Sequence, residues 1–119
     1  MAQKKVWAVA GANDRPEKFG CMIYKKLKSK GYKVFAVNPN YKTVDGDICY
    51  PDISSLPEVP EVIDMVVNPR QGRTVIEEAI RLGVKNIWLQ PGTYDDDLIA
   101  FIEQNGLTYV KACVLVDIQ

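Results

Sequence analysis

The fold is decided by residues 6–20, which read VWAVAGANDRPEKFG. Residues 6–10 form an apolar run that is too short for a helix and is typical of a buried strand. A glycine turn begins at Gly11, and an amphipathic stretch then continues to Lys30. A strand, a glycine turn and a helix in this order bring unpaired backbone N–H groups and the positive end of the helix dipole to one spot. The stretch therefore predicts an anion site, and such sites most often bind phosphate.

A helix, a glycine and a strand then recur three times along the chain. Helices with an apolar stripe end at Gly31, Gly83 and Gly106, and a short strand follows each glycine. Glycine just past a helix takes the left-handed conformation that closes its last turn. Strands that alternate with such helices predict βαβ units and a parallel sheet. The expected strands are residues 6–10, 32–37, 62–67, 85–89 and 107–110.

We therefore predict an α/β fold with an open, doubly wound parallel sheet of five main strands and helices on both faces. Numbered along the chain, the five strands have the order 2-1-3-4-5. A short edge strand at residues 48–50, within the proline-rich segment 38–60, changes this order to 3-2-1-4-5-6. Residues 1–119 are expected to form a single domain. Ligands of such sheets bind beyond the carboxyl ends of the strands, beside the first strand.

Polar amide side chains mark the carboxyl ends of these strands. Asn13 follows the first strand closely, and Asn38-Pro39, Asn68-Pro69 and Gln90-Pro91 follow the next three. Proline fixes the turn, while the amide offers both a hydrogen-bond donor and an acceptor. We expect all four strand ends to face one crevice; ordinary strand-ending turns are the alternative.

The composition argues against several classes of function. Fifteen Lys and Arg balance 15 Asp and Glu, which disfavours a nucleic-acid binder that works through bulk charge. No apolar run reaches the roughly 18 residues of a membrane span. The start of the chain has no signal-peptide pattern, and three cysteines without metal-ligand spacing are typical of reduced thiols in the cytoplasm. The chain has no histidine, so Ser-His-Asp and Cys-His catalysis and phosphohistidine chemistry are excluded.

The expected ligand carries phosphate groups at two separate places. The G-x-G-x-x-G fingerprint is absent, and neutral Asn38 stands where NAD sites place an acidic residue. NAD is therefore disfavoured. Arg15 and Lys18 lie at the glycine loop, and Lys42 lies just past the second strand. Two separated basic sites suit a diphosphate and a second, distant phosphate.

Four segments of the chain, in their order and spacing, resemble the small bacterial and archaeal CoA-binding proteins. They are residues 9–20, 37–41, 46–51 and 88–92. These proteins are stand-alone, Rossmann-like domains similar to the CoA-binding domain of the succinyl-CoA synthetase alpha subunit. The resemblance covers nearly the whole chain, and it implies coenzyme A or an acyl-CoA as the bound cofactor.

The resemblance also implies roles for matching positions. The loop from Gly11 to Gly20 would hold the CoA diphosphate, the segment around Asn38 would line the adenosine end, and Asn68 would flank the pantetheine. Asn13 departs from the family pattern, which has a small hydroxyl residue there. The predicted cofactor site consists of Gly11, Ala12, Asn13, Arg15, Pro16, Lys18, Phe19, Gly20, Asn38, Pro39, Tyr41, Lys42, Asn68 and Pro69.

No residue is assigned a catalytic role and no metal site is predicted. The acidic run at residues 95–97 stands where the third long helix should begin, so helix capping explains it best. Cys113 follows the last strand, where its thiol would be able to exchange with the CoA thiol, but a small buried core residue is the interpretation that we favour. We predict non-catalytic binding of CoA or acyl-CoA. The alternatives are an NAD(P)- or acyl-CoA-dependent enzyme and a nucleotide-sensing module with an unknown protein partner.

Overall fold

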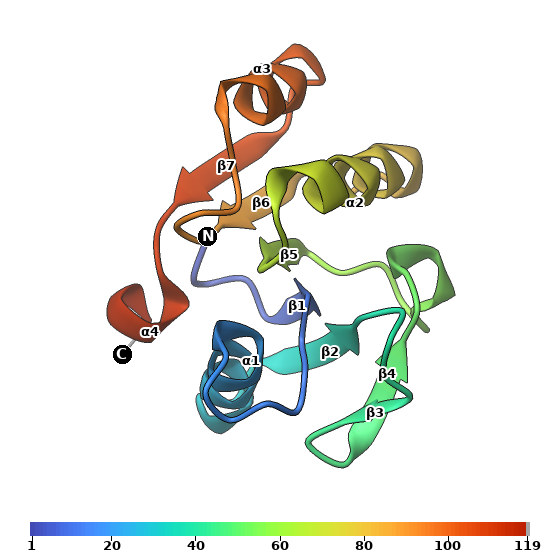
Figure 1. Cartoon of the computed structure of the whole chain (residues 1–119). Coiled ribbons are helices and arrows are strands. Elements are labelled where there is room, and N and C mark those ends of the chain that lie inside the picture. Colours follow the sequence, from blue (N-terminus) through green and yellow to red (C-terminus); the bar gives the residue numbers. More distant parts are fainter. Residues whose placement is uncertain (119) are drawn as a thin grey trace.

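A single sheet runs through the protein in the computed structural model, which describes residues 1–118 (Figure 1). Within these residues the sheet has seven strands in the order β3-β4-β2-β1-β5-β6-β7. Every neighbouring pair is parallel except β3 and β4. The strands are β1 (Val6–Ala10), β2 (Lys33–Val37), β3 (Thr43–Val44), β4 (Asp47–Tyr50), β5 (Val62–Met65), β6 (Asn86–Leu89) and β7 (Thr108–Lys111).

The six parallel strands confirm the predicted doubly wound order. Numbered along the chain without β3, the order β4-β2-β1-β5-β6-β7 is 3-2-1-4-5-6. The expected short strand at residues 48–50 is β4, but it is not the edge, because β3 pairs with it in an antiparallel hairpin. The hairpin turn is Asp45-Gly46, and both residues have a positive φ, 53° and 79°. Asp-Gly is a favoured dipeptide for such a two-residue turn.

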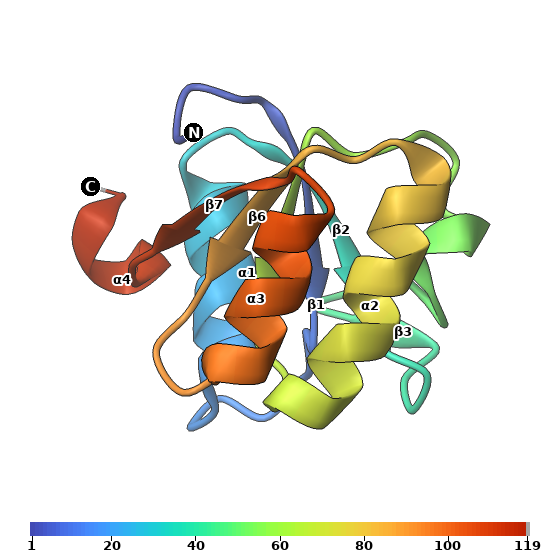
Figure 2. The same ribbon diagram turned by 90° about the horizontal axis from the view of Figure 1, so that it is seen from above.

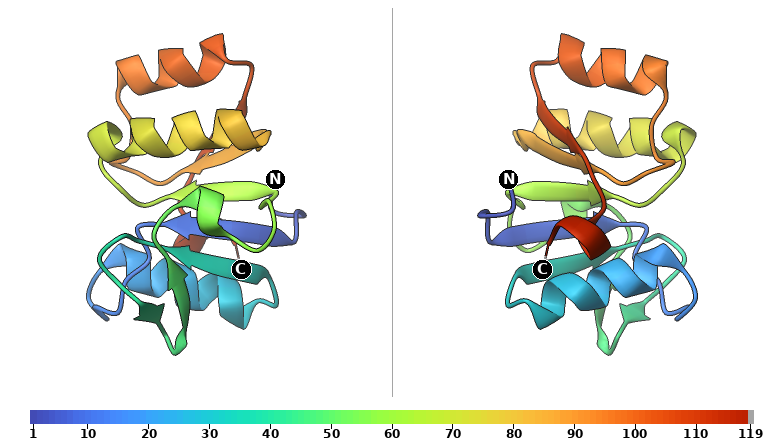
Figure 3. Two further views of the ribbon diagram at one scale, coloured as in Figure 1. Left: turned by 90° about the vertical axis from the view of Figure 1, so that its right-hand side faces the viewer. Right: turned by 90° about the vertical axis from the view of Figure 1, so that its left-hand side faces the viewer.

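Helices cover both faces of the sheet, as predicted (Figures 2 and 3). α1 (Phe19–Ser29) and the short α4 (Val114–Asp117) pack on one face. α2 (Pro69–Leu82), α3 (Asp96–Gln104) and the 3-10 turn η1 (Ile53–Ser55) pack on the other. None of the helices in residues 1–118 is both long and apolar enough to cross a membrane.

Two hydrophobic cores lie on the two faces of the sheet. Alternate residues of β1 point to opposite sides, so that Trp7 and Val9 join the core under α1 while Ala8 joins the core under α2 and α3. Strands buried on both faces need continuous apolar runs, and β5 breaks this rule with Asp64, which is fully buried. The carboxyl ends of the strands lead into the loops described next.

Candidate functional site

Three adjoining hollows follow the carboxyl ends of the central strands. The first, called the α1-side cavity, has a volume of about 360 Å³ and lies between the start of α1, the end of β5 and the loop after β6. The second, the α2-side cavity, has about 270 Å³ and lies between the end of β2 and α2. A bridging hollow shares Val67 with both cavities. The helix after β1 packs on one face of the sheet and the helix after β5 packs on the other. A crevice between such connections is where doubly wound sheets bind their ligands.

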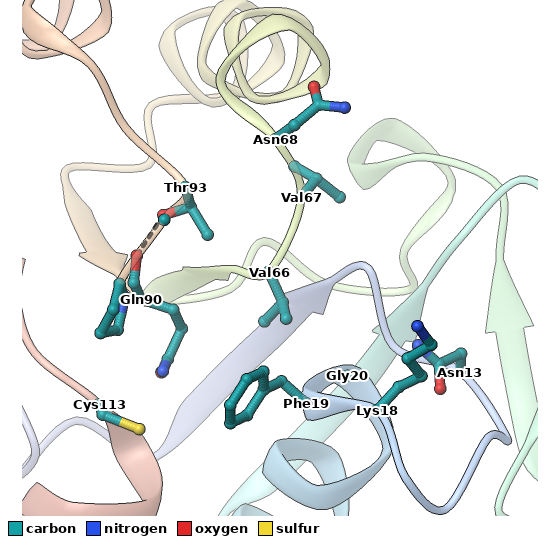
Figure 4. A pocket seen from close by; sticks show the side chains of 12 residues that line it. Asn13, Lys18, Phe19, Gly20, Val66, Val67, Asn68, Gln90, Thr93 and Cys113 are labelled. Carbon is teal, nitrogen blue, oxygen red and sulfur yellow. Dashed lines mark hydrogen bonds between the residues drawn. The ribbon is translucent and has the colours of Figure 1, made fainter.

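The α1-side cavity is lined from four segments of the chain (Figure 4). The start of α1 contributes one wall, and the loops after β5 and β6 and the residue before α4 contribute the others. Its lining residues are Asn13, Lys18, Phe19, Gly20, Val66, Val67, Asn68, Gln90, Pro91, Gly92, Thr93 and Cys113.

The glycines of the first loop allow the backbone of this site to pack closely. Gly11 has a φ of +103°, and a Cβ atom placed on it would lie 2.4 Å from the carbonyl oxygen of Val66. A Cβ atom on Gly20 would lie 2.2 Å from the carbonyl oxygen of Gly11. The missing side chains thus bring the start of α1 against the ends of β1 and β5. The sequence predicted that these glycines let the backbone approach a ligand closely. At Gly11 and Gly20 the close contact is instead with other backbone atoms of the protein.

The first turn of α1 keeps free hydrogen-bond donors. Its N-cap residue, Lys18, makes no capping bond with its side chain, whereas the N-caps of α2 and α3, Asn68 and Asp95, each accept a backbone N–H. The first backbone hydrogen bond of α1 is donated by the N–H of Met22 to the carbonyl oxygen of Lys18, at 3.2 Å. Within residues 1–118 the N–H groups of residues 19–21 have no acceptor. Together with the dipole, they form an anion-binding surface.

The basic groups near this turn are not neutralised. Lys18 lines the α1-side cavity, whereas Arg15 and Pro16 are exposed in the loop before it and line none of the three hollows. Neither Arg15 nor Lys18 forms an ion pair with any residue in the described range. The first turn of α1 has no acidic residue. Asp14 and Glu17 lie in the same loop, so the side chains there have no net charge, and the positive potential at this point comes from the N-terminus of α1 and from Lys18 beside it.

Asn38, at the end of β2, uses its side chain within the protein. Its Nδ2 donates to the carbonyl oxygen of Ala12 at 2.9 Å, and its Oδ1 accepts from the N–H of Asn40 at 2.9 Å. Ala12 is buried, so this bond ties the glycine loop to the end of β2. Asn38 and Pro39 line the bridging hollow. Tyr41 packs against the core under α1 and lines none of the hollows.

Two further predicted residues have mainly local roles in this geometry. Asn68 lines the cavity wall, but its Oδ1 accepts from the N–H of Gln71 at 2.9 Å and so caps α2. Pro69 is the first residue of α2, where its fixed φ suits the helix. Asp95 caps α3 by accepting from Leu98 at 2.8 Å, which confirms the capping interpretation of the acidic run.

The loop after β6 and the residue before α4 contribute groups that the predicted site lacks. Gln90 is 3% exposed, and its Oε1 accepts from the N–H of Val114 at 3.1 Å. Its amide nitrogen reaches toward the cavity (Figure 4). Thr93 is also buried, and its Oγ1 donates to the carbonyl oxygen of Gln90 at 2.7 Å. Cys113 lies on the cavity wall and is partly exposed, so it is not the fully buried core residue that the sequence favoured.

The titratable side chains that line the α1-side cavity are Lys18 and Cys113. The α2-side cavity holds Asp52 and Glu78, and both carboxylates accept hydrogen bonds from the backbone of η1. In the described part of the chain, no group of three or more His, Cys, Asp or Glu side chains is arranged to hold a metal ion. The cavity thus offers donors for an anionic or amide-bearing ligand.

Comparisons with known proteins agree with this arrangement. The family model described as CoA binding domain matches residues 5–119. An uncharacterized protein, YneT, of Bacillus subtilis is 28% identical over 120 residues, which cover 98% of this chain and 87% of YneT. A conserved hypothetical protein from Pyrococcus furiosus has a solved structure with a TM-score of 0.90 and 38% identity, over 95% of this chain and 98% of that one.

A longer enzyme contains a similar region. The ADP-forming acetate–CoA ligase I of Archaeoglobus fulgidus is 29% identical over 116 residues, which are 89% of this chain but 17% of the ligase. The protein is thus a Rossmann-like α/β domain with a crevice at its topological switch point. It belongs to the CoA-binding domain family.

Proposed function

We propose that this protein binds coenzyme A or an acyl-CoA in the crevice and does not itself transform it. The observation that carries the proposal is the first turn of α1, which has three N–H groups without an acceptor among the described residues and borders the same cavity as Lys18. A diphosphate is the part of CoA that these donors suit. Membership of the CoA-binding domain family supports the same ligand.

The adenosine end would lie toward β2 and the bridging hollow. The side chain of Asn38 is neutral and both its polar atoms are used within the protein, so this position lacks the carboxylate with which NAD sites bind the ribose diol. Lys42 is exposed just beyond this strand and forms no ion pair with a described residue. We assign it to the 3′-phosphate, which CoA has and NAD lacks.

The pantetheine would then run through the α1-side cavity. Val66, Val67 and Phe19 give this cavity apolar walls, and Gln90 supplies amide donors. A flexible chain with methyl groups and two amides fits such a lining. The shortage of acidic and basic groups there supports binding without catalysis, because general acid–base chemistry needs a titratable group at the reacting atoms.

Titration calorimetry with CoA, dephospho-CoA and NAD tests the ligand. We expect CoA to bind about tenfold more tightly than NAD, a difference of about 1.4 kcal/mol. Lys42→Ala should lower the affinity for CoA but not that for dephospho-CoA, whereas Lys30→Ala, at the opposite end of α1, should change neither. NAD binding as tight as CoA binding would refute the proposal.

A further inference from the structure

The three cysteines of the chain lie in different environments. Cys21 and Cys49 are buried, with 2% and 6% of their surface exposed. Cys113 is partly exposed and lies on the wall of the α1-side cavity, across from Phe19 (Figure 4). Its N–H donates to the Oδ2 of Asp117 at 3.0 Å, which holds the backbone of this residue at the start of α4. The thiol is therefore the accessible one of the three, and it faces a cavity rather than bulk solvent alone.

A second group in the same cavity also points to a ligand. The Gln90 side chain is 97% buried, as its exposed fraction is 3%, yet among residues 1–118 no acceptor bonds its amide nitrogen. That nitrogen reaches into the cavity between Cys113 and Phe19 (Figure 4). The nitrogen borders the cavity and is not enclosed by protein, so a ligand in the cavity would be able to supply the acceptor that this donor lacks. An amide carbonyl of a bound chain is such an acceptor.

We propose that Cys113 forms a reversible mixed disulfide with the thiol of bound CoA. This inference rests on the CoA binding of the proposed function and adds to it a stoichiometric, reversible exchange at the sulfur, without catalytic turnover. With the diphosphate at the start of α1, the pantetheine chain passes Val66 and the Gln90 amide, and the far wall of the cavity is Cys113. Figure 4 shows Lys18 at one side of the cavity and Gln90 and Cys113 at the other, which suits a ligand with a diphosphate at one end and a thiol at the other.

The reaction is a thiol–disulfide exchange whose oxidising partner is a CoA disulfide. The thiolate of Cys113 attacks one sulfur of the CoA disulfide, so a bond forms between Sγ and that sulfur while the bond between the two CoA sulfurs breaks. The second CoA leaves as a thiolate and takes up a proton from water. A free thiol reverses the step by attack on the mixed disulfide. No metal or further electron acceptor is required.

The test incubates the reduced protein with CoA disulfide and follows the intact mass and the CoA thiol released. We expect one CoA attached to each chain and one CoA thiol released for each attachment. Peptide mapping should locate the modification on Cys113. Because binding raises the local concentration of the disulfide, the reaction should be at least about tenfold faster than with cystamine, a disulfide without the nucleotide.

Two variants and one ligand competition sharpen the test. Cys113→Ser should abolish the adduct, whereas Cys49→Ala, which removes a buried thiol that lines none of the hollows, should leave its rate unchanged. Acetyl-CoA in excess, whose sulfur is blocked as a thioester and cannot reduce the mixed disulfide, should slow the reaction by competing for the site. Equal rates with CoA disulfide and cystamine, or an adduct that maps to another cysteine, would overturn the inference while calorimetric CoA binding left the proposed function intact. A failure of the reduced protein to bind CoA would overturn both.

Discussion

Replacement of Asp64 by Asn should remove a decline in the stability of the protein as the pH rises. Asp64 lies in the middle of β5, between Val9 of β1 and Trp88 of β6 in the sheet register. It is 0% exposed, and neither carboxylate oxygen has a hydrogen-bond partner among the described residues. Burial without a partner disfavours the charged form, so the pKa of Asp64 is raised well above its usual value.

The sign and size of the effect follow from this shift. The native state keeps the proton at pH values where the unfolded chain, with an aspartate pKa of about 3.9, has released it. The native state therefore binds more protons, and the free energy of unfolding falls as the pH rises from the unfolded pKa to the folded pKa. The slope in this window approaches about 1.4 kcal/mol for each pH unit. Burial also raises the pKa values of Tyr24 and Cys49 on the same face, so these groups stay neutral in the window.

Urea unfolding between pH 4 and pH 8, followed by the fluorescence of the buried Trp7 and Trp88, measures this slope. The amide introduced by Asp64→Asn has no titrating proton, so the variant should lose the decline. The new amide is buried without a partner, as the neutral carboxyl of Asp64 is, so this cost is common to the two proteins. We therefore expect them to have similar stability near pH 4 and the variant to be the more stable protein at higher pH. Parallel pH profiles for the two proteins would refute the assignment of a buried, neutral carboxyl.

Three further predictions concern the glycine loop and the amino-terminal ends of the central strands. Lys18→Ala should weaken CoA binding by about 1–3 kcal/mol at low salt and by less at high salt; an unchanged dissociation constant at low ionic strength would remove Lys18 from the site. Gly20→Ala should lower the free energy of unfolding by about 1–3 kcal/mol, because its Cβ would overlap the carbonyl oxygen of Gly11; urea unfolding at native-like stability would contradict the close packing. The carboxylate of Glu61 accepts from the N–H groups of Val6 and Lys5, and these bonds lower the pKa of Glu61. Glu61→Gln should therefore reduce the stability of the protein at neutral pH, and this loss should disappear as the pH falls through the lowered pKa. Thermal unfolding scans of the two proteins should converge in acid, and a difference in stability that stays constant with pH would contradict the prediction.

Much of the fold could be predicted from the sequence because its signals are local. The apolar run at residues 6–10 and the glycines after the helices identify β1 and the βαβ units, and the strand order follows from them. The hairpin of β3 and β4 was missed as a pair, although Asp45-Gly46 is a local signal for its turn. Its strand β3 has two residues, too few for an alternating pattern to be recognised.

The walls of the site were harder to predict because they depend on contacts between distant segments. Asp14 accepts from the N–H of Asp45 at 2.7 Å, and this bond joins the glycine loop to a hairpin 31 residues later. Arg15 lies beside that junction and lines none of the hollows. Conversely, Gln90 reaches the cavity because its other amide atom is held by Val114, 24 residues further on. Neither orientation is encoded in the residues next to it.

The division of hydrogen bonds at the crevice explains why no short motif identifies its ligand. The amides of Asn38 and Asn68 look like ligand contacts in the sequence, but the protein uses them to fix its own loops. The donors that remain available there include the backbone N–H groups at the start of α1 and the amide nitrogen of Gln90. Backbone donors carry no residue signature, and almost any side chain would supply them. A site of this kind is therefore recognised in a sequence through the spacing of the glycines that permit its geometry. At the other end of the cavity, the proposed exchange with the CoA sulfur depends on a single residue, Cys113.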